Sequence, residues 1–169
     1  MAEQRNPTDK NDQFLLGNDY EFGGEGISID LQKAVYWYTK AAEQGHPEAQ
    51  CYLGTCYLNG SGVSNDTQKA VYWYTKAAEQ GQVNAMLGLG ICYDAGLGVS
   101  KDAQKAVSWY TKAAELGNSQ AQFNLGMSYH HGDGVRQDFE KAVYWYAKAA
   151  EQGNADAATN LRALKSRGY

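Results

Sequence analysis

Residues 33–45 read Lys33-Ala34-Val35-Tyr36-Trp37-Tyr38-Thr39-Lys40-Ala41-Ala42-Glu43-Gln44-Gly45, and this segment recurs almost unchanged at three further places in the chain. The copies begin at Lys69, Lys105 and Lys141, so each starts 36 residues after the one before. All 4 tryptophans of the 169-residue chain occupy a single position of this segment. A fixed period of this length predicts a repeat protein in which each copy forms one structural unit.

The repeated segment predicts an amphipathic helix, here called helix B of each repeat. Its apolar residues follow the i, i+3, i+4, i+7, i+8 spacing of one buried stripe. In the second repeat these are Ala70, Trp73, Tyr74, Ala77 and Ala78. Asp66 is the predicted N-cap, with Asp30, Asp102 and Asp138 at the equivalent positions, and Gly81 supplies the C-terminal stop.

A second helix, helix A, is predicted ahead of each helix B and runs from about Glu48 to Asn59 in the second repeat. Its core stripe consists of Ala49, Leu53 and Tyr57. Gly54 beside this stripe lets helix B approach closely, and Gly60 and Gly62 turn the chain between the helices. Because one hairpin cannot bury its own aromatic face, we expect the hairpins to stack into a continuous core.

The predicted fold is therefore all-α, an α/α superhelix (solenoid) of four antiparallel helix-hairpin repeats with a C-terminal capping helix. The predicted segments are a polar N-terminal tail (1–11), four repeats (12–47, 48–83, 84–119 and 120–155) and the capping helix with its tail (156–169). The first repeat has one extra residue in its Gly23–Gly26 turn, which should not disturb the stacking. Arg162 and Lys165 give the last helix the polar outer face of a cap, so we expect the chain to be complete at that end.

These residues closely resemble the Sel-1-like repeat (SLR) family, which is related to the tetratricopeptide repeats. The motif is Ala-x-x-x-Leu-Gly-x-x-Tyr-x-x-Gly-x-Gly-Val-x-x-Asp-x-x-Lys-Ala-x-x-Trp-Tyr-x-x-Ala-Ala-x-x-Gly. It fits residues 49–81, 85–117 and 121–153 throughout, and residues 16–45 apart from the insertion. The resemblance implies a right-handed superhelix with helix A on the concave side, and a role as a bacterial adaptor, scaffold or specific inhibitor.

Composition excludes some classes of partner. The net charge is −4 with a pI of about 5.3, and no clustered basic face is visible, so we expect no binding to nucleic acid. No apolar run approaches the roughly 20 residues of a membrane span, and residues 1–13 lack the apolar region of a signal peptide. Cys51, Cys56 and Cys92 are predicted to be free thiols, which favours the cytoplasm. A periplasmic or secreted location is the alternative, if a signal peptide has been removed.

The sequence gives little support for chemistry. His130, His131 and Asp133 form the one cluster that resembles a metal site, but adjacent helical residues diverge by about 100° and no third histidine is near. The Gly-x-Gly turns follow helices rather than strands, so they do not fit a dinucleotide loop. The Trp-Tyr pairs are assigned to the core rather than to stacking platforms. We therefore expect no catalytic residue, no cofactor and no metal ion.

A binding site is expected at the helix A positions that differ between repeats and point away from the core stripe. Apolar anchors beside adaptable polar groups are typical of a protein or peptide interface. The predicted residues are Asn18, Glu21, Phe22, Tyr52, Thr55, Leu58, Asn59, Ile91, Asp94, Asn124, Met127, His130 and His131. Cys51, Leu87 and Phe123 are assigned instead to packing between repeats. A site on the convex face or an edge is the alternative.

The predicted function is that of a non-catalytic protein–protein interaction module that binds a protein or peptide on its concave surface. We expect the chain to be monomeric or weakly self-associating. Two alternatives come from the family resemblance. One is an immunity protein that neutralises a secreted bacterial effector. The other is a weak cell-wall or β-lactam hydrolase, as in the cysteine-rich branch, although this chain lacks the paired cysteines of that branch.

Overall fold

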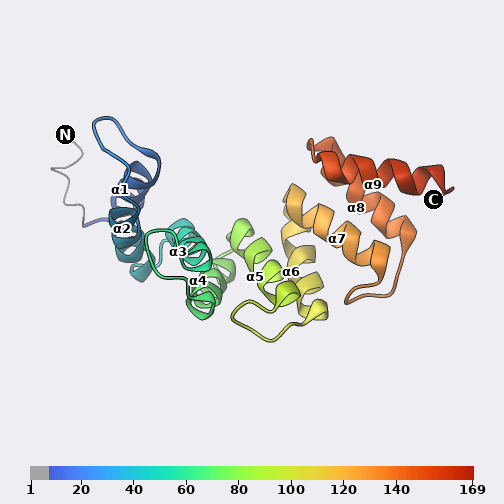
Figure 1. Ribbon diagram of the computed structural model, residues 1–169, viewed down its shortest axis with the longest axis horizontal. Coiled ribbons are helices and arrows are strands. Elements are labelled where there is room, and N and C mark those ends of the chain that lie inside the picture. Colours follow the sequence, from blue (N-terminus) through green and yellow to red (C-terminus); the bar gives the residue numbers. More distant parts are fainter. Residues whose placement is uncertain (1–7) are drawn as a thin grey trace. The chain divides into compact units, whose positions relative to one another are not determined.

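The computed structural model describes residues 8–169, and all regular structure in this part of the chain is helical. The helices are α1 (Lys10–Phe22), α2 (Leu31–Glu43), α3 (Pro47–Asn59), α4 (Thr67–Glu79), α5 (Val83–Ala95), α6 (Ala103–Glu115), α7 (Ser119–His131), α8 (Phe139–Glu151) and α9 (Ala155–Ser166) (Figure 1). The predicted all-α class, in which helix hairpins follow one another along the chain, is confirmed. Residues 1–7 of the predicted tail lie outside the described residues, and α1 already begins at Lys10.

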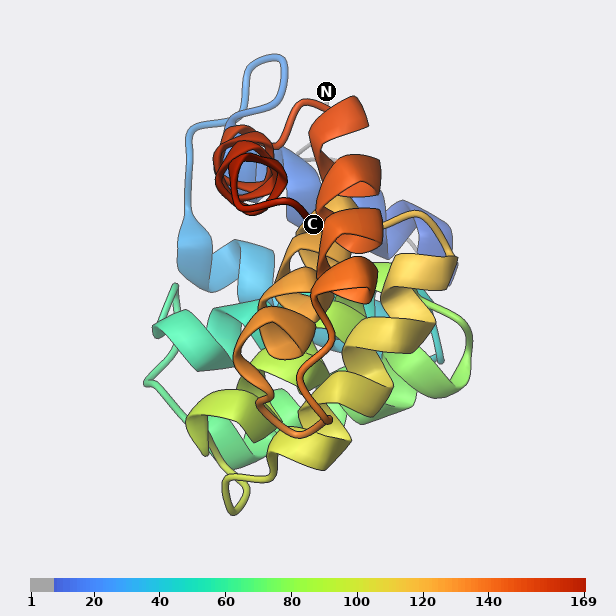
Figure 2. The same ribbon diagram turned by 90° about the vertical axis from the view of Figure 1, so that its right-hand side faces the viewer.

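The chain divides into two compact units, one ending at Ala85 and the other beginning at Met86. In the first unit α1 packs on α2, α2 on α3 and α3 on α4. In the second unit α6 packs on α7, α7 on α8 and α8 on α9. Figure 2 shows the last of these contacts, with α9 in dark red beside α8 in orange. Each of these eight helices therefore contacts mainly its neighbours along the chain.

The helix B starts are fixed by the predicted aspartates. The Asp66 carboxylate accepts a hydrogen bond of 3.0 Å from the backbone N–H of Lys69, and its second oxygen lies 3.3 Å from the Lys69 ammonium group. The same pair occurs at the start of α2, α6 and α8. These interactions lower the pKa of Asp66, with the backbone hydrogen bond as the largest cause. The predicted N-caps are therefore confirmed.

The helix A caps are a feature that the sequence analysis did not identify. His46, Asn118 and Asn154 cap α3, α7 and α9, each by accepting a hydrogen bond from the backbone N–H three residues later. Nδ1 of His46 accepts this bond at 3.2 Å, so the imidazole must be neutral at that nitrogen. The ring is buried, and this burial lowers the pKa of His46 despite the nearby Glu48.

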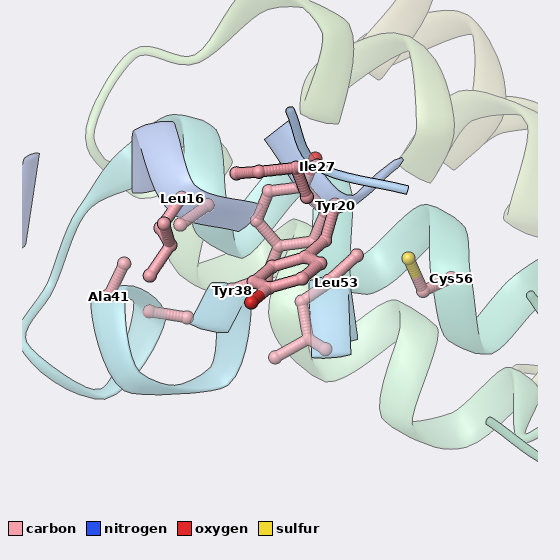
Figure 3. Close-up of a cluster of buried hydrophobic side chains, with 10 residues drawn as sticks. Leu16, Tyr20, Ile27, Tyr38, Ala41, Leu53 and Cys56 are labelled. Carbon is pink, nitrogen blue, oxygen red and sulfur yellow. The ribbon is translucent and has the colours of Figure 1, made fainter. Parts of the chain in front are cut away.

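The core of each hairpin is a tyrosine ring laid against a glycine. A Cβ atom added at Gly54 would lie 2.8 Å from Cδ1 of Tyr74, so only glycine allows this approach. Gly17 has the same relation to Tyr38, whose ring packs among Leu16 and Leu53 in the first unit (Figure 3). The close approach predicted for the Leu-Gly pairs is therefore confirmed, and its partner is the tyrosine that follows each tryptophan.

The structure corrects the assignment of the tryptophans. The tyrosine of each Trp-Tyr pair is buried, but Trp37, Trp73, Trp109 and Trp145 are only half-buried. In the second repeat Trp73 packs against the core cluster. Tyr72, which precedes Trp73 in the sequence, is 53% exposed and meets the Trp73 ring edge-on. The core stripe is therefore narrower than the spacing predicts, and helix B keeps aromatic surface exposed to solvent.

Three of the four repeats contain two glutamine side chains that are hydrogen-bonded to each other. In the second repeat the Gln80 side chain donates to Gln50 at 2.7 Å, and Gln50 donates to the carbonyl of Ala42 at 3.1 Å. Equivalent pairs join Gln44 to Gln13 and Gln152 to Gln122. The third repeat has Met86 and Leu116 at these positions, so an apolar pair replaces a polar one.

Candidate functional site

The thirteen predicted binding residues, here called the variable face, all lie on helix A, and none of them is fully buried. Six of them are exposed: Phe22, Thr55, Asn59, Ile91, Asp94 and His131. The others are half-buried: Asn18, Glu21, Tyr52, Leu58, Asn124, Met127 and His130. Residues up to Asn59 belong to the first unit and those from Ile91 onward to the second, so each unit carries its own part.

The buried helix B tyrosines end beneath the variable face. In the first unit, the hydroxyl group of Tyr38 lies 2.8 Å from Oδ1 of Asn18 and 2.5 Å from Oε2 of Glu21, so it can donate its proton to either. The hydroxyl of Tyr74 lies 3.0 Å from that of Thr55. Burial raises the pKa of Tyr38 above its ordinary value, and the nearby Glu21 raises it further. The Tyr38 hydroxyl therefore stays protonated, and both hydroxyl groups lie within hydrogen-bond distance of side chains of the variable face.

The same arrangement recurs in the second unit with different contacts. Tyr110 is hydrogen-bonded to Asn124, and burial followed by the charge of Asp94 raises its pKa. The hydroxyl of Tyr146 lies 3.3 Å from Nδ1 of His130. Sequence reasoning placed these tyrosines in the core and missed their polar ends. The sequence did contain a signal for these polar ends. The tyrosine is the same in every repeat, whereas the residue that its hydroxyl group contacts differs from repeat to repeat.

A surface hollow of about 430 Å³ lies on the second unit, between α5 and α7 with Tyr110 of α6. It gathers every predicted residue of that unit except His130. The lining consists of Ile91, Asp94, Ala95, Tyr110, Gln120, Phe123, Asn124, Met127, Ser128, His131 and Asp133. Phe123, which the sequence analysis assigned to packing, packs 5.9 Å from the Tyr146 ring and lines the hollow as well.

The variable face of the first unit also carries apolar side chains. Tyr52 is an aromatic anchor whose ring centroid lies 5.3 Å from that of Tyr38 and 5.6 Å from that of Phe14. Phe22 is 64% exposed at the C-terminal end of α1. Leu58 and Asn59 lie at the C-terminal end of α3, where the Asn65 side chain donates to the Leu58 carbonyl. Phe22, Tyr52 and Leu58 therefore offer accessible apolar surface beside the polar Asn59.

The two neighbouring histidines correct one expectation. Their rings do not diverge but stack, with centroids 4.6 Å apart and planes 9° apart. His130 also meets the edge of Phe139, and its burial lowers its pKa, helped by His131 and Arg167. Within residues 8–169 no three His, Cys, Asp or Glu side chains come together as a metal site.

Charge is distributed unevenly between the two kinds of helix. α3, α5 and α7 contain no lysine or arginine, whereas α2, α4, α6 and α8 contain two lysines each. The charged residues of the variable face are Glu21 and Asp94, and Asp133 follows α7 after Gly132. The lysines near the helix B starts pair with the N-cap aspartates. The variable face therefore carries carboxylates and no lysine or arginine, whereas α2, α4, α6 and α8 each carry two lysines.

The helix B side of the first unit has a hollow of its own. It has a volume of about 310 Å³ and is lined by Ala42, Glu43, Gly45, Gln50, Tyr72, Trp73 and Lys76. The half-buried tryptophan and the exposed tyrosine form its aromatic wall. This hollow is a second accessible surface besides the variable face.

The cysteines contribute no reactive group. Cys51, Cys56 and Cys92 are free and buried, as the sequence predicted. Burial raises the pKa of Cys51 and Cys56 to about 12 each and that of Cys92 to about 11, so the thiolate is scarce near neutral pH.

Among the described helices, none is long and apolar enough to cross a membrane.

These helices define a tandem helical-repeat protein with a conserved core and a variable face. The Sel1 repeat model of protein families matches the chain four times, at residues 12–46, 47–82, 83–118 and 119–154. The chain belongs to the Sel1-repeat family, and the resemblance found in the sequence is confirmed.

Solved structures show the same relationship. A protective antigen present in uropathogenic Escherichia coli strains, described as displaying an SLR fold, is 42% identical with a TM-score of 0.91, over 95% of this chain and 34% of that one. A Sel1 repeat protein from Oxalobacter formigenes is 40% identical with a TM-score of 0.84, over 90% and 60%. Cysteine rich protein B of Helicobacter pylori is 31% identical with a TM-score of 0.63, over 79% and 96%. The chain thus spans less than two thirds of the first two proteins. No curated protein matches it.

Proposed function

We propose that the chain is a non-catalytic binding module, an adaptor, scaffold or specific inhibitor, and that its variable face binds a protein or peptide. The observation that carries this proposal is the hollow between α5 and α7. It combines apolar side chains (Ile91, Met127) with polar ones (Asn124, His131) at positions that differ between repeats. Mixed surfaces of this kind, with an apolar centre and a polar rim, are typical of protein interfaces.

The repeat uses different positions for packing and for its accessible surface, and this supports the same proposal. The invariant residues are used for packing, as the Tyr146 ring against Gly126 illustrates. The thirteen residues of the variable face, which differ between repeats, are all exposed or half-buried. A recognition surface needs this freedom to vary, because changing an exposed side chain leaves the core intact.

Affinity capture from the source organism tests the proposal. The bait is the wild-type chain, an Ile91→Ser variant or a Tyr72→Ala control, which changes the helix B hollow instead. Ile91 is 36% exposed, so the substitution should leave the fold intact, and circular dichroism checks this. We expect partner recovery to fall with Ile91→Ser and to persist with Tyr72→Ala. The reverse result would assign binding to the helix B side.

The absence of catalysis is tested separately. A nitrocefin assay on the apo protein and on metal-loaded protein covers the hydrolase alternative. We expect no turnover above buffer, because the described thiols are buried with raised pKa values. Turnover that survives purification to homogeneity would contradict the proposal.

A further inference from the structure

The hollow between α5 and α7 carries two carboxylates. Asp94 lies near the end of α5, and Asp133 lies in the turn after α7. Both are exposed, and neither forms an ion pair with any residue from 8 to 169. No lysine or arginine lines the hollow. The cavity therefore presents negative charge that the chain itself leaves unbalanced.

The helix ends add to this polarity. α5 ends at Ala95 and α7 ends at His131, and both of these residues line the hollow. The C-terminal end of a helix carries the negative end of its dipole and favours cations. Two such ends border one cavity, so the backbone and the carboxylates favour the same sign of ligand charge.

The remaining lining matches the shape of a basic side chain. Ile91, Phe123 and Met127 offer an apolar wall, along which the stem of a lysine or arginine can lie. Asn124 and Gln120, which are linked by a 3.0 Å hydrogen bond, provide amide groups in the same hollow. A guanidinium group has five N–H donors in a plane and can use several such acceptors at once, so arginine suits the site better than lysine.

We propose that this hollow binds an arginine or lysine side chain that neighbours an apolar residue in a segment of the partner protein. The inference rests on the proposed function and adds the chemistry of the partner. An acidic segment would meet Asp94 and Asp133 as like charges, which opposes binding.

A selection from a library of short random peptides displayed on phage tests the inference, with the immobilised full chain as the target. Selected peptides are then synthesised, and their binding is measured by fluorescence anisotropy. The test variant is Asp94→Asn with Asp133→Asn, which keeps the side-chain shapes and removes both charges. The matched control is Glu115→Gln with Glu151→Gln, which makes the same change of net charge on exposed helix B ends.

We expect the selected peptides to carry arginine or lysine beside leucine, isoleucine or phenylalanine. Their affinity should fall at least about tenfold in the aspartate variant and stay within about twofold in the control. It should also weaken as salt is added, because the carboxylates are exposed.

Three outcomes would overturn the inference. Neutral or acidic peptides that lose binding with Ile91→Ser would leave the binding role standing and reject the basic ligand. Peptides unaffected by Ile91→Ser and by the aspartate variant, or an empty selection, would count against the binding role as well. Self-association that is lost in the aspartate variant would identify the occupant as a second copy of the chain.

Discussion

Replacing the helix A glycines with alanine tests whether the tyrosine rings set the spacing of the hairpins. A Cβ atom at Gly17 would lie 2.4 Å from both Cδ1 and Cε1 of Tyr38, whereas at Gly54 the corresponding distances to Tyr74 are 2.8 and 2.9 Å. Ordinary contact begins at 3.4 Å, so the Tyr38 ring must retreat by about 1 Å and the Tyr74 ring by about half that distance. Tyr38 is fully buried, so its ring is surrounded by other protein atoms.

The two variants should therefore differ in stability. Overpacking costs about 1–3 kcal/mol, and alanine regains about 1 kcal/mol through its better helix propensity. We assign the upper end of that cost to Gly17→Ala and the lower end to Gly54→Ala. The expected net loss is about 2 kcal/mol for Gly17→Ala and close to zero for Gly54→Ala.

Urea unfolding followed by far-ultraviolet circular dichroism measures both free energies of unfolding. Gly45→Ala is a control, because its φ of +79° strains an alanine while no atom lies within 4 Å of the added Cβ. It should cost about 1–2 kcal/mol without displacing any ring. The reasoning is refuted if Gly17→Ala is as stable as the wild type, or if Gly54→Ala is the more damaging of the two.

Three further predictions follow from the caps, the glutamine pairs and the thiols. His46→Asn copies the caps Asn118 and Asn154, and it should reduce the loss of stability that acid causes below a pH of about 6.5. Burial lowers the pKa of His46 in the folded state, so the unfolded chain binds the proton more readily. The free energy of unfolding of the wild type therefore decreases as the pH decreases. Urea unfolding between about pH 7.5 and 5 compares the two proteins, and identical pH profiles would contradict the prediction. Gln50→Met should cost about 1 kcal/mol, since it removes two hydrogen bonds; adding Gln80→Leu, which copies the third repeat, should recover most of this in thermal unfolding, and no recovery would count against the pairing. Cys51 and Cys56, whose pKa values burial raises to about 12, should react with iodoacetamide at pH of about 8 far more slowly in the native protein than in urea, as read by mass spectrometry; equal rates would disprove their protection.

The repeat architecture could be predicted from the sequence because its causes are local. Asp66 caps its helix through a backbone group three residues away, and Gly54 meets a ring of the same repeat. Each copy of the motif supplied the same information again. The caps on helix A were missed because His46, Gln82 and Asn118 differ chemically and do not form a visible motif. Their common feature is an acceptor atom three residues before the buried alanine.

For the variable face, the sequence could predict only which side chains point away from the core stripe. The shape of the surface could not be predicted, because it depends on contacts between helices. Counting residues around α7 places His130 and His131 on the outer surface, but only the structure shows that His130 leans onto Phe139 and leaves His131 in the hollow. Phe139 occurs in the fourth repeat alone, so no comparison of repeats could reveal this contact. Phe123 packs as predicted, although its partner Tyr146 belongs to the same repeat, and the same ring also lines the cavity.

The neighbour-to-neighbour packing of the helices has a consequence for how such proteins can change during evolution. Within each unit, α2 contacts α1 and α3, and α8 contacts α7 and α9. A duplication or deletion of one whole repeat would join surfaces that already fit each other, because the residues that meet there recur at every 36th position. Recombination between repeats can thus lengthen, shorten or reshuffle the variable face while the buried residues stay the same.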